Sequence, residues 1–119
     1  MTAAEFKIKR ERLGVSGRWL ADRVGVLDRQ VRRWESGVAP VPADVVKFVD
    51  DLDAEARELA RKLRGAPRPL VSYRNDGEYW ASDTDAAARS IPASFYRAAL
   101  GRILENGVSV AYPSVSNEG

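Results

Sequence analysis

The sequence predicts an α+β fold, in which an N-terminal part of four to five helices precedes a small hairpin–helix–strand part. Three observations lead to this prediction. Helical patterns separated by glycines fill residues 1–64. The segment RGAPRP then contains helix breakers, so we expect two domains, 1–64 and 65–119. Beyond it, β-prone runs flank Asn75-Asp76-Gly77, which is typical of a hairpin turn.

The composition narrows the class of protein. The 119 residues suit one small domain, or two very small units that share a core. No apolar run approaches the roughly 20 residues of a membrane span, and the first residues lack an apolar signal segment, so we expect a cytoplasmic protein without a membrane partner. Cysteine and histidine are absent, which excludes disulfides, thiolate and imidazole catalysis and the usual zinc ligands. We therefore expect no enzyme, no metal and no cofactor.

Helix-capping residues and glycines divide residues 1–64 into separate helices. Four helical patterns follow one another at residues 3–13, 17–24, 27–37 and 42–64. A glycine follows or ends each of the first three. Ser16 suits the N-cap of the second helix, Leu27 or Asp28 starts the third, and Pro42 suits the first position of the fourth.

The fourth helix carries an apolar seam with heptad spacing. Its members are Val45, Val49, Leu52, Ala56, Leu59 and Leu63. The seam fits either a helix that packs inside its own domain or a helix that meets a partner in a dimer. Because about three heptads are marginal for an independent coiled coil, we expect the seam to pack on further elements.

The C-terminal part mixes strand and helix signals. After the hairpin, residues 83–90 suit a loop or a short helical turn, and Pro92 can open a helix over residues 91–106. The alternating residues 108–112 suit a strand that could join the hairpin, and residues 113–119 suit a mobile tail. The aromatic residues are expected mostly in the core, with some available to a dimer interface: Tyr73, Tyr79, Trp80, Phe95, Tyr96 and Tyr112.

Positive charge is concentrated in the first third of the chain. Residues 1–42 carry nine Lys/Arg against five Asp/Glu, a net +4, whereas residues 43–64 and 65–119 each carry five against six. A polyanion that docks on the first third would fit this distribution. Chance fluctuation in an arginine-rich sequence is the alternative.

The third helical pattern has one polar and one apolar face. At about 100° per residue, its charged residues fall within an arc of about 140°. They are Asp28, Arg29, Arg32 and Arg33. Val31 and Trp34 lie opposite and suit a core, and Gln30 borders the arc. Because a short helix and a tight turn precede it, the pattern predicts a helix-turn-helix, whose second helix can enter the major groove of double-stranded DNA.

The residue types on this face suit base recognition. Arg29 and Arg33 are the first candidates, because a guanidinium can bond guanine O6 and N7 together. Gln30 can do the same on adenine, and Arg32 can reach a base or a phosphate. Asp28 can accept from cytosine, although pairing with Arg32 or favouring the helix N-terminus suits it better. For each of these residues, a solvated surface side chain is the alternative.

Phosphate contacts are expected on both sides of the polar face of the third helix. Ser16, Gly17 and Arg18 begin the second helix, where free amides attract anions. The backbone amides at Gly37 and Val38, after the third helix, are the second set of candidates.

The motif LA-x-x-x-GV, from Leu20 to Val26, and the later RRWESG resemble the Cro and phage-repressor (XRE-type) helix-turn-helix domain. The resemblance covers about a third of the chain, and it implies DNA binding and an ion pair between Glu35 and Arg10. The sequence departs from the family in two places. SGRW stands where a phosphate-binding Gln usually opens the second helix, and Leu27 stands where a Ser or Thr usually caps the third.

The later segments are more loosely similar to the C-terminal part of small regulators of the anti-CRISPR-associated kind. That similarity implies a small α/β dimerisation domain. The residues expected at a dimer interface come from the long helix and from this domain: Leu52, Leu59, Leu63, Tyr96, Leu100 and Tyr112.

Two functions fit these observations. The first is a homodimeric, sequence-specific transcription regulator, a repressor that occupies an inverted repeat of DNA in a promoter. The second is an antitoxin or adaptor whose C-terminal half binds a protein partner, with DNA binding for autoregulation.

Overall fold

The computed structural model describes residues 1–104 and 107–114. Within them lie seven helices and two short strands, which agrees with the predicted α+β class. The chain forms two compact units, Met1–Glu58 and Leu59–Gly119. The division falls inside the long helix α4 (Ala43–Arg64) rather than after it, because the last turns of this helix pack with residues that follow them.

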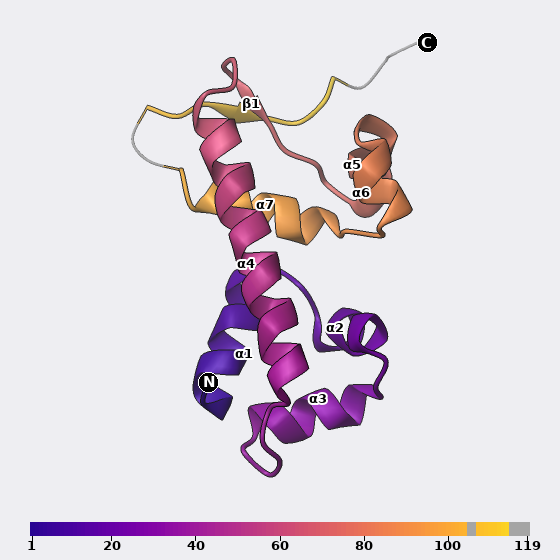
Figure 1. Cartoon of the computed structure of the whole chain (residues 1–119). Helices are drawn as coiled ribbons and strands as arrows, with labels where there is room; N and C mark the ends of the chain where they lie inside the picture. Colours follow the sequence, from indigo (N-terminus) through magenta and orange to yellow (C-terminus); the bar gives the residue numbers. More distant parts are fainter. Residues whose placement is uncertain (105–106, 115–119) are drawn as a thin grey trace. The chain divides into compact units, whose positions relative to one another are not determined.

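Three short helices and the first part of α4 build the N-terminal unit (Figure 1). These helices are α1 (Ala3–Arg12), α2 (Gly17–Val24) and α3 (Asp28–Glu35). Local caps set their bounds: Ser16 Oγ accepts a hydrogen bond from the Trp19 amide, and Gly25 ends α2 in the left-handed conformation at φ 75°. The four predicted helices are confirmed. Pro42 precedes α4 rather than beginning it, and its carbonyl accepts the first helical hydrogen bonds.

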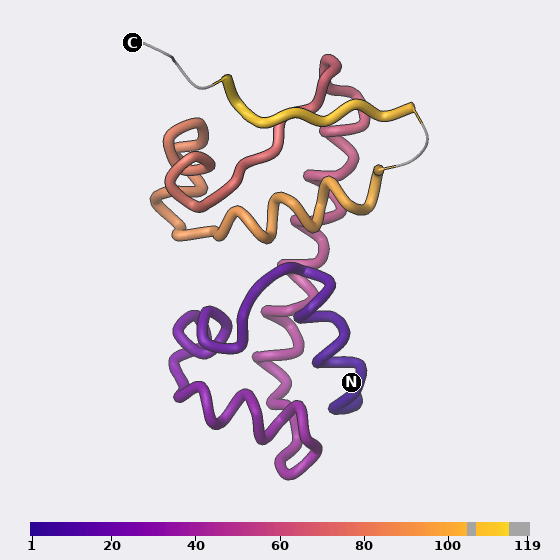
Figure 2. Tube along the Cα trace, turned by 180° about the vertical axis from the view of Figure 1, so that it is seen from behind, coloured from indigo at the N-terminus to yellow at the C-terminus, as the bar shows by residue number. Residues whose placement is uncertain are grey.

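A shared apolar core holds these helices together. Seen from behind in Figure 2, α1, α2 and α3 lie around the first part of α4. Their most deeply buried side chains are Phe6, Leu13, Leu20, Val31, Trp34 and Val49. The rings of Phe6 and Trp34 meet edge to face with their centroids 6.0 Å apart, an arrangement that aromatic pairs prefer.

The heptad seam of α4 is covered by the chain itself. Its positions are all buried or half-buried: Val45, Val49, Leu52, Ala56, Leu59 and Leu63. Of the two readings of the seam, the structure therefore supports a helix that packs inside its own chain. A partner helix would find the seam occupied.

The predicted hairpin around Asn75-Asp76-Gly77 is wrong. The Asn75 side chain accepts a hydrogen bond from the Glu78 amide at 2.9 Å and thereby starts α5 (Asp76–Ser82). Asn is favoured at helix N-caps as well as in hairpin turns, and acidic residues in the first turn stabilise the helix N-terminus. The same residues therefore encode both structures, and here the helix forms.

Two more helices and a minimal sheet complete the C-terminal unit. They are α6 (Thr84–Ala88), α7 (Ala93–Gly101), β1 (Leu70–Val71) and β2 (Val110–Ala111). The strands pair in parallel, with Leu70 opposite Val110. The predicted final strand is thus present in part, but its partner is β1 and not a hairpin. Residues 105–106 of the predicted helix and 115–119 of the predicted tail lie outside the described residues.

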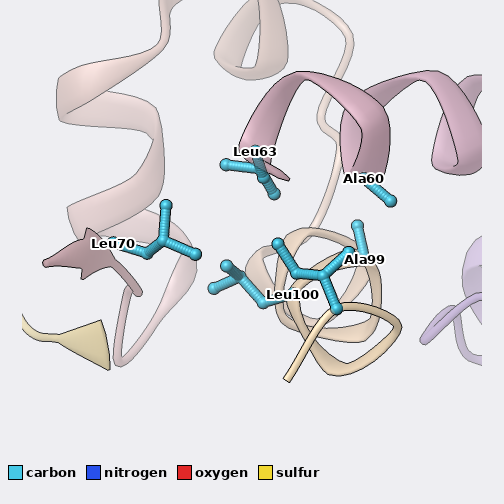
Figure 3. Packing of buried hydrophobic residues seen from close by; sticks show 6 residues of the cluster. Ala60, Leu63, Leu70, Ala99 and Leu100 are labelled. Carbon is cyan, nitrogen blue, oxygen red and sulfur yellow. The ribbon is translucent and has the colours of Figure 1, made fainter. Parts of the chain in front are cut away.

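A compact apolar cluster joins α7, β1 and the end of α4. Its members are Ala60, Leu63, Leu70, Ala99, Leu100 and Ile103. Figure 3 shows Leu63, Leu70 and Leu100 pointing toward one another from these three elements. The cluster explains why the last turns of α4 belong to the C-terminal unit.

The predicted dimer-interface residues are mostly covered within their own chain. Five of the six are buried or half-buried: Leu52, Leu59, Leu63, Tyr96 and Leu100. Tyr112 is exposed, with the Arg74 guanidinium 4.3 Å from the centre of its ring. Of these six residues, Tyr112 alone is exposed, so the other five are less accessible to a second copy.

Three tyrosines form an aromatic group in the C-terminal unit. The ring centroids of Tyr73, Tyr79 and Tyr96 lie between 5.1 and 5.3 Å apart. Burial raises the pKa of Tyr79 and of Tyr96 from 10.0 to about 12, and the Asp83 carboxylate adds to the shift at both rings. Folding therefore favours the neutral phenols.

These raised pKa values predict a loss of stability in alkali. The stabilisation is fully present below pH 10.0, the ordinary pKa, and is lost as the pH rises toward about 12. Urea unfolding measured across this pH range should show a free energy of unfolding that decreases as the pH rises. The decrease should be smaller in Tyr79→Phe, which lacks one of the two phenols. Phenolate absorbance that rises fully near pH 10 while the circular dichroism stays native would contradict the burial of these rings.

Candidate nucleic-acid interface

The inner face of α3 anchors the helix in the N-terminal unit. Val31 and Trp34 are almost completely buried, and Trp34 packs against Phe6 of α1. Both residues were predicted on the inner face, and their burial confirms it. The opposite face of α3 is thereby turned to solvent in a fixed orientation.

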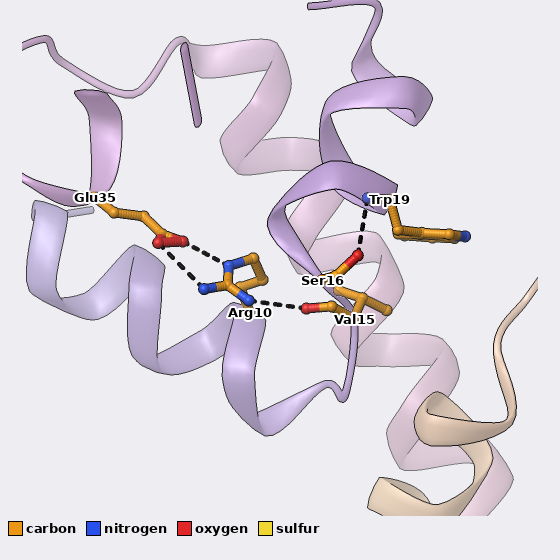
Figure 4. A network of polar contacts seen from close by, with 5 residues as sticks. All are labelled: Arg10, Val15, Ser16, Trp19 and Glu35. Carbon is orange, nitrogen blue, oxygen red and sulfur yellow. Dashed lines mark hydrogen bonds and ion pairs between the residues drawn. The ribbon is translucent and has the colours of Figure 1, made fainter. Parts of the chain in front are cut away.

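An ion pair ties the C-terminal end of α3 to α1. Arg10 Nε donates to Glu35 Oε1 at 2.5 Å, and Arg10 Nη2 donates to Glu35 Oε2 at 3.2 Å (Figure 4). The third donor, Arg10 Nη1, bonds the Val15 carbonyl at 3.0 Å, which also holds the loop before α2. The side chains of Arg10 and Glu35 are only 16% and 11% exposed. The pair predicted from the family resemblance is therefore present, with bidentate geometry.

The outer face of α3 presents two arginines that are free to bind. Arg29 and Arg33 are exposed, and their side chains make no hydrogen bond or ion pair with any residue in the described part of the chain. Arg32, in contrast, forms an ion pair with Asp28 one turn earlier. The four charged residues of the predicted arc thus divide into two free guanidinium groups and one internal pair.

Asp28 has structural roles that were expected for it. Besides holding Arg32, it stands in the first turn of α3, where a carboxylate is favourable. A methyl group added at Gly17 would lie 3.3 Å from Asp28 Oδ1, so the glycine lets α2 approach α3 closely. These contacts favour support over base reading for Asp28.

The two predicted sets of phosphate contacts differ in availability. At the start of α2, Ser16 Oγ accepts a hydrogen bond from the Trp19 amide (Figure 4). The Gly17 and Arg18 amides have no acceptor among the described residues. After α3, the Gly37 amide already donates to the Trp34 carbonyl and the Val38 amide to the Arg33 carbonyl. These two amides also lie at a helix C-terminus, whose dipole repels anions.

The start of α2 is accordingly the better phosphate site, with Arg18 exposed beside it. Gly37 and Val38 would have to give up bonds that end α3 before their amides could reach a phosphate. The sequence could not reveal this, because the bonds depend on the backbone course after Ser36.

A further residue of this surface was not predicted as a contact. Leu27 is the N-cap of α3, makes no capping hydrogen bond with its side chain, and is 64% exposed. It borders an open pocket of about 400 Å³. The pocket is lined by Val26, Leu27, Arg29, Gln30, Trp34 and Pro42. The signal in the sequence was the departure from the usual Ser or Thr at this cap.

Comparison with known proteins adds no assignment. No protein-family model matches the chain, and no curated protein matches it. Within residues 1–104 and 107–114, no helix is both long and apolar enough to cross a membrane. The same stretch contains no group of three or more acidic side chains placed to hold a metal ion. What the α3 face can do therefore follows from its own residues.

The Arg10–Glu35 pair should matter more to stability than exposed ion pairs do. Glu35→Gln leaves the half-buried Arg10 without its charge partner, and we expect the free energy of unfolding in urea to fall by about 1–3 kcal/mol. Asp51→Asn is the matched control, because it breaks the exposed Lys47–Asp51 pair and should lower the free energy of unfolding much less. Equal losses in both variants would contradict an anchoring role for Glu35.

Proposed function

We propose that the chain is a sequence-specific DNA-binding regulator of the helix-turn-helix type, with α3 as the reading helix. The observation that carries the proposal is the pair of exposed arginines on α3, Arg29 and Arg33, without partners in the described part of the chain. The opposite face of α3 is fixed by Val31, Trp34 and the Glu35 ion pair. A fixed helix that offers free guanidinium groups has the form needed to read base edges.

The spacing of the two arginines suits base pairs about two steps apart. Residues four apart on a helix are separated by about 6 Å along its axis, against about 3.4 Å between successive base pairs. Arg29 and Arg33 would therefore reach guanines about two steps apart, with Gln30 beside them for an adenine. The free amides of Gly17 and Arg18 would hold the backbone phosphate at the start of α2. The net +4 of residues 1–42 supports the same placement of DNA.

We propose further that the protein acts as a homodimer on an inverted repeat. Two reading helices would then meet half-sites about 34 Å apart, or a multiple of this distance. Because the leucines first expected at the dimer interface are buried or half-buried in their own chain, the contact is better sought at exposed apolar residues of the C-terminal unit. These are Val71, Leu104 and Tyr112. A small dimer that occupies a promoter would repress by blocking access to it.

The same exposed residues also favour the second candidate, an antitoxin or adaptor whose C-terminal unit binds another protein. Sedimentation of the purified chain distinguishes the two. A stable dimer at micromolar concentration supports the homodimeric regulator. A chain that aggregates instead of forming a defined dimer supports the adaptor.

The reading role of α3 can be tested with duplexes selected from a random pool by the full chain. Arg29→Ala or Arg33→Ala should weaken binding to the selected duplex by about 1–3 kcal/mol, while affinity for scrambled DNA changes much less. Arg18→Ala should weaken both duplexes alike and lower the salt dependence, as expected for a phosphate contact.

The control variant is Arg64→Ala, which removes one exposed positive charge at the end of α4, outside the proposed interface. It should leave the preference for the selected duplex unchanged. Failure to select any duplex, or equal losses on selected and scrambled DNA for both α3 variants, would overturn the proposed function.

A further inference from the structure

Leu27 is a large apolar side chain exposed at the edge of the face of α3 that carries Arg29 and Arg33. It is 64% exposed, and it stands at the N-cap of α3, where a residue with a side-chain oxygen would bond a free backbone amide. Leucine can make no such bond. In the free protein the side chain therefore neither caps the helix nor lies in the core.

The surroundings of Leu27 define the chemistry of a contact there. The pocket beside it has an apolar lining from Val26, Trp34 and Pro42, and a polar edge from Arg29 and Gln30. Gln30 is half-buried at this edge. The surface thus joins an apolar patch to two side chains that can bond the edges of purines.

Base edges in the major groove offer one apolar group that fits such a patch. This group is the C5-methyl of a pyrimidine, which thymine always carries and cytosine carries only when methylated. An A·T pair offers adenine N6 and N7 to a glutamine and the thymine methyl to an apolar neighbour in the same groove. Gln30 and Leu27, which line one pocket, match these two features.

We propose that Leu27 contacts the C5-methyl group of a pyrimidine, thymine in ordinary DNA, and so makes the protein prefer that base beside those read by Arg29 and Gln30. The inference rests on the proposed DNA-binding function and deepens it, because it assigns part of the specificity to an apolar contact. Leu27 is a specificity-determining residue that none of the charged groups on α3 can replace.

The test replaces single thymines with deoxyuridine in a duplex selected from a random pool by the full chain. This change removes only the methyl group. At one thymine in each half-site, the wild-type chain should bind the deoxyuridine duplex about fourfold more weakly, the effect of burying one methyl group. In Leu27→Ala and Leu27→Ser the two duplexes should bind equally.

Two variants keep the result independent of folding. Leu27→Ser supplies a capping hydroxyl to α3, so its thermal midpoint should be at least that of the wild type while the discrimination is lost. Ile8→Ala is the matched control, because Ile8 is equally exposed at 63% but lies on α1, and it should keep the fourfold ratio.

A second pair of duplexes separates the two sources of the methyl group. The same position is occupied by cytosine in one duplex and 5-methylcytosine in the other. A gain on methylation that disappears in Leu27→Ala supports reading of the methyl group itself, whereas a gain that persists in this variant assigns it to another residue.

The outcomes against the proposal are distinct from failure of the proposed function. Selection of a specific duplex, followed by an unchanged thymine-to-deoxyuridine ratio at every position, overturns the role of Leu27 while leaving DNA reading intact. The same holds if Leu27→Ala keeps the ratio but loses self-association in sedimentation, which would assign Leu27 to a protein contact. If no duplex is selected at all, the proposed function fails first, and this inference fails with it.

Discussion

The ion pair between Arg10 and Glu35 is the interaction on which the geometry of the N-terminal unit depends. It uses all three donor nitrogens of one guanidinium, two for Glu35 and one for the Val15 carbonyl, and so joins α1, the loop before α2 and the end of α3. A pair this far from solvent gains little net free energy, because both charges lose water. Its contribution is orientation: the bidentate geometry allows one direction for the end of α3.

With one face of α3 held, the other face can carry unpaired charge. Val31 and Trp34 supply the apolar burial, and Asp28 neutralises Arg32 within the helix. Arg29 and Arg33 are left without partners in the described part of the chain. Two exposed cations without partners add nothing to the stability of the free protein, whereas a polyanion would bond both. On this face Arg32 is paired with Asp28, whereas Arg29 and Arg33 are unpaired in the described part of the chain. These two unpaired arginines are the main physical argument for recognition through α3.

The sequence predicted the N-terminal helices well because several of their boundaries have a local signal. Ser16 can cap a helix and Gly25 can end one, and both do so regardless of distant residues. The C-terminal unit depends on non-local choices. Asn75 suits a turn and a cap equally, and the parallel pairing of Leu70 with Val110 joins segments far apart in the chain.

Within the candidate site, helical periodicity alone predicted which residues lie on the exposed face of α3 and which lie on its inner face. Their availability was not, since it depends on which neighbour each side chain meets. The pairing of Arg32 with Asp28 could be expected from their four-residue spacing. The amides used after Glu35 and the exposure of Leu27 follow only from the folded structure.

The most direct measurement of α3 as the reading helix is the coupling between Arg33 and guanine N7. Replacing single guanines of the selected duplex by 7-deazaguanine should weaken binding by the wild type at one position in each half-site. At that position the Arg33→Ala variant should bind the guanine and 7-deazaguanine duplexes with equal affinity. A loss of the same size in both proteins at every guanine would contradict base reading by Arg33.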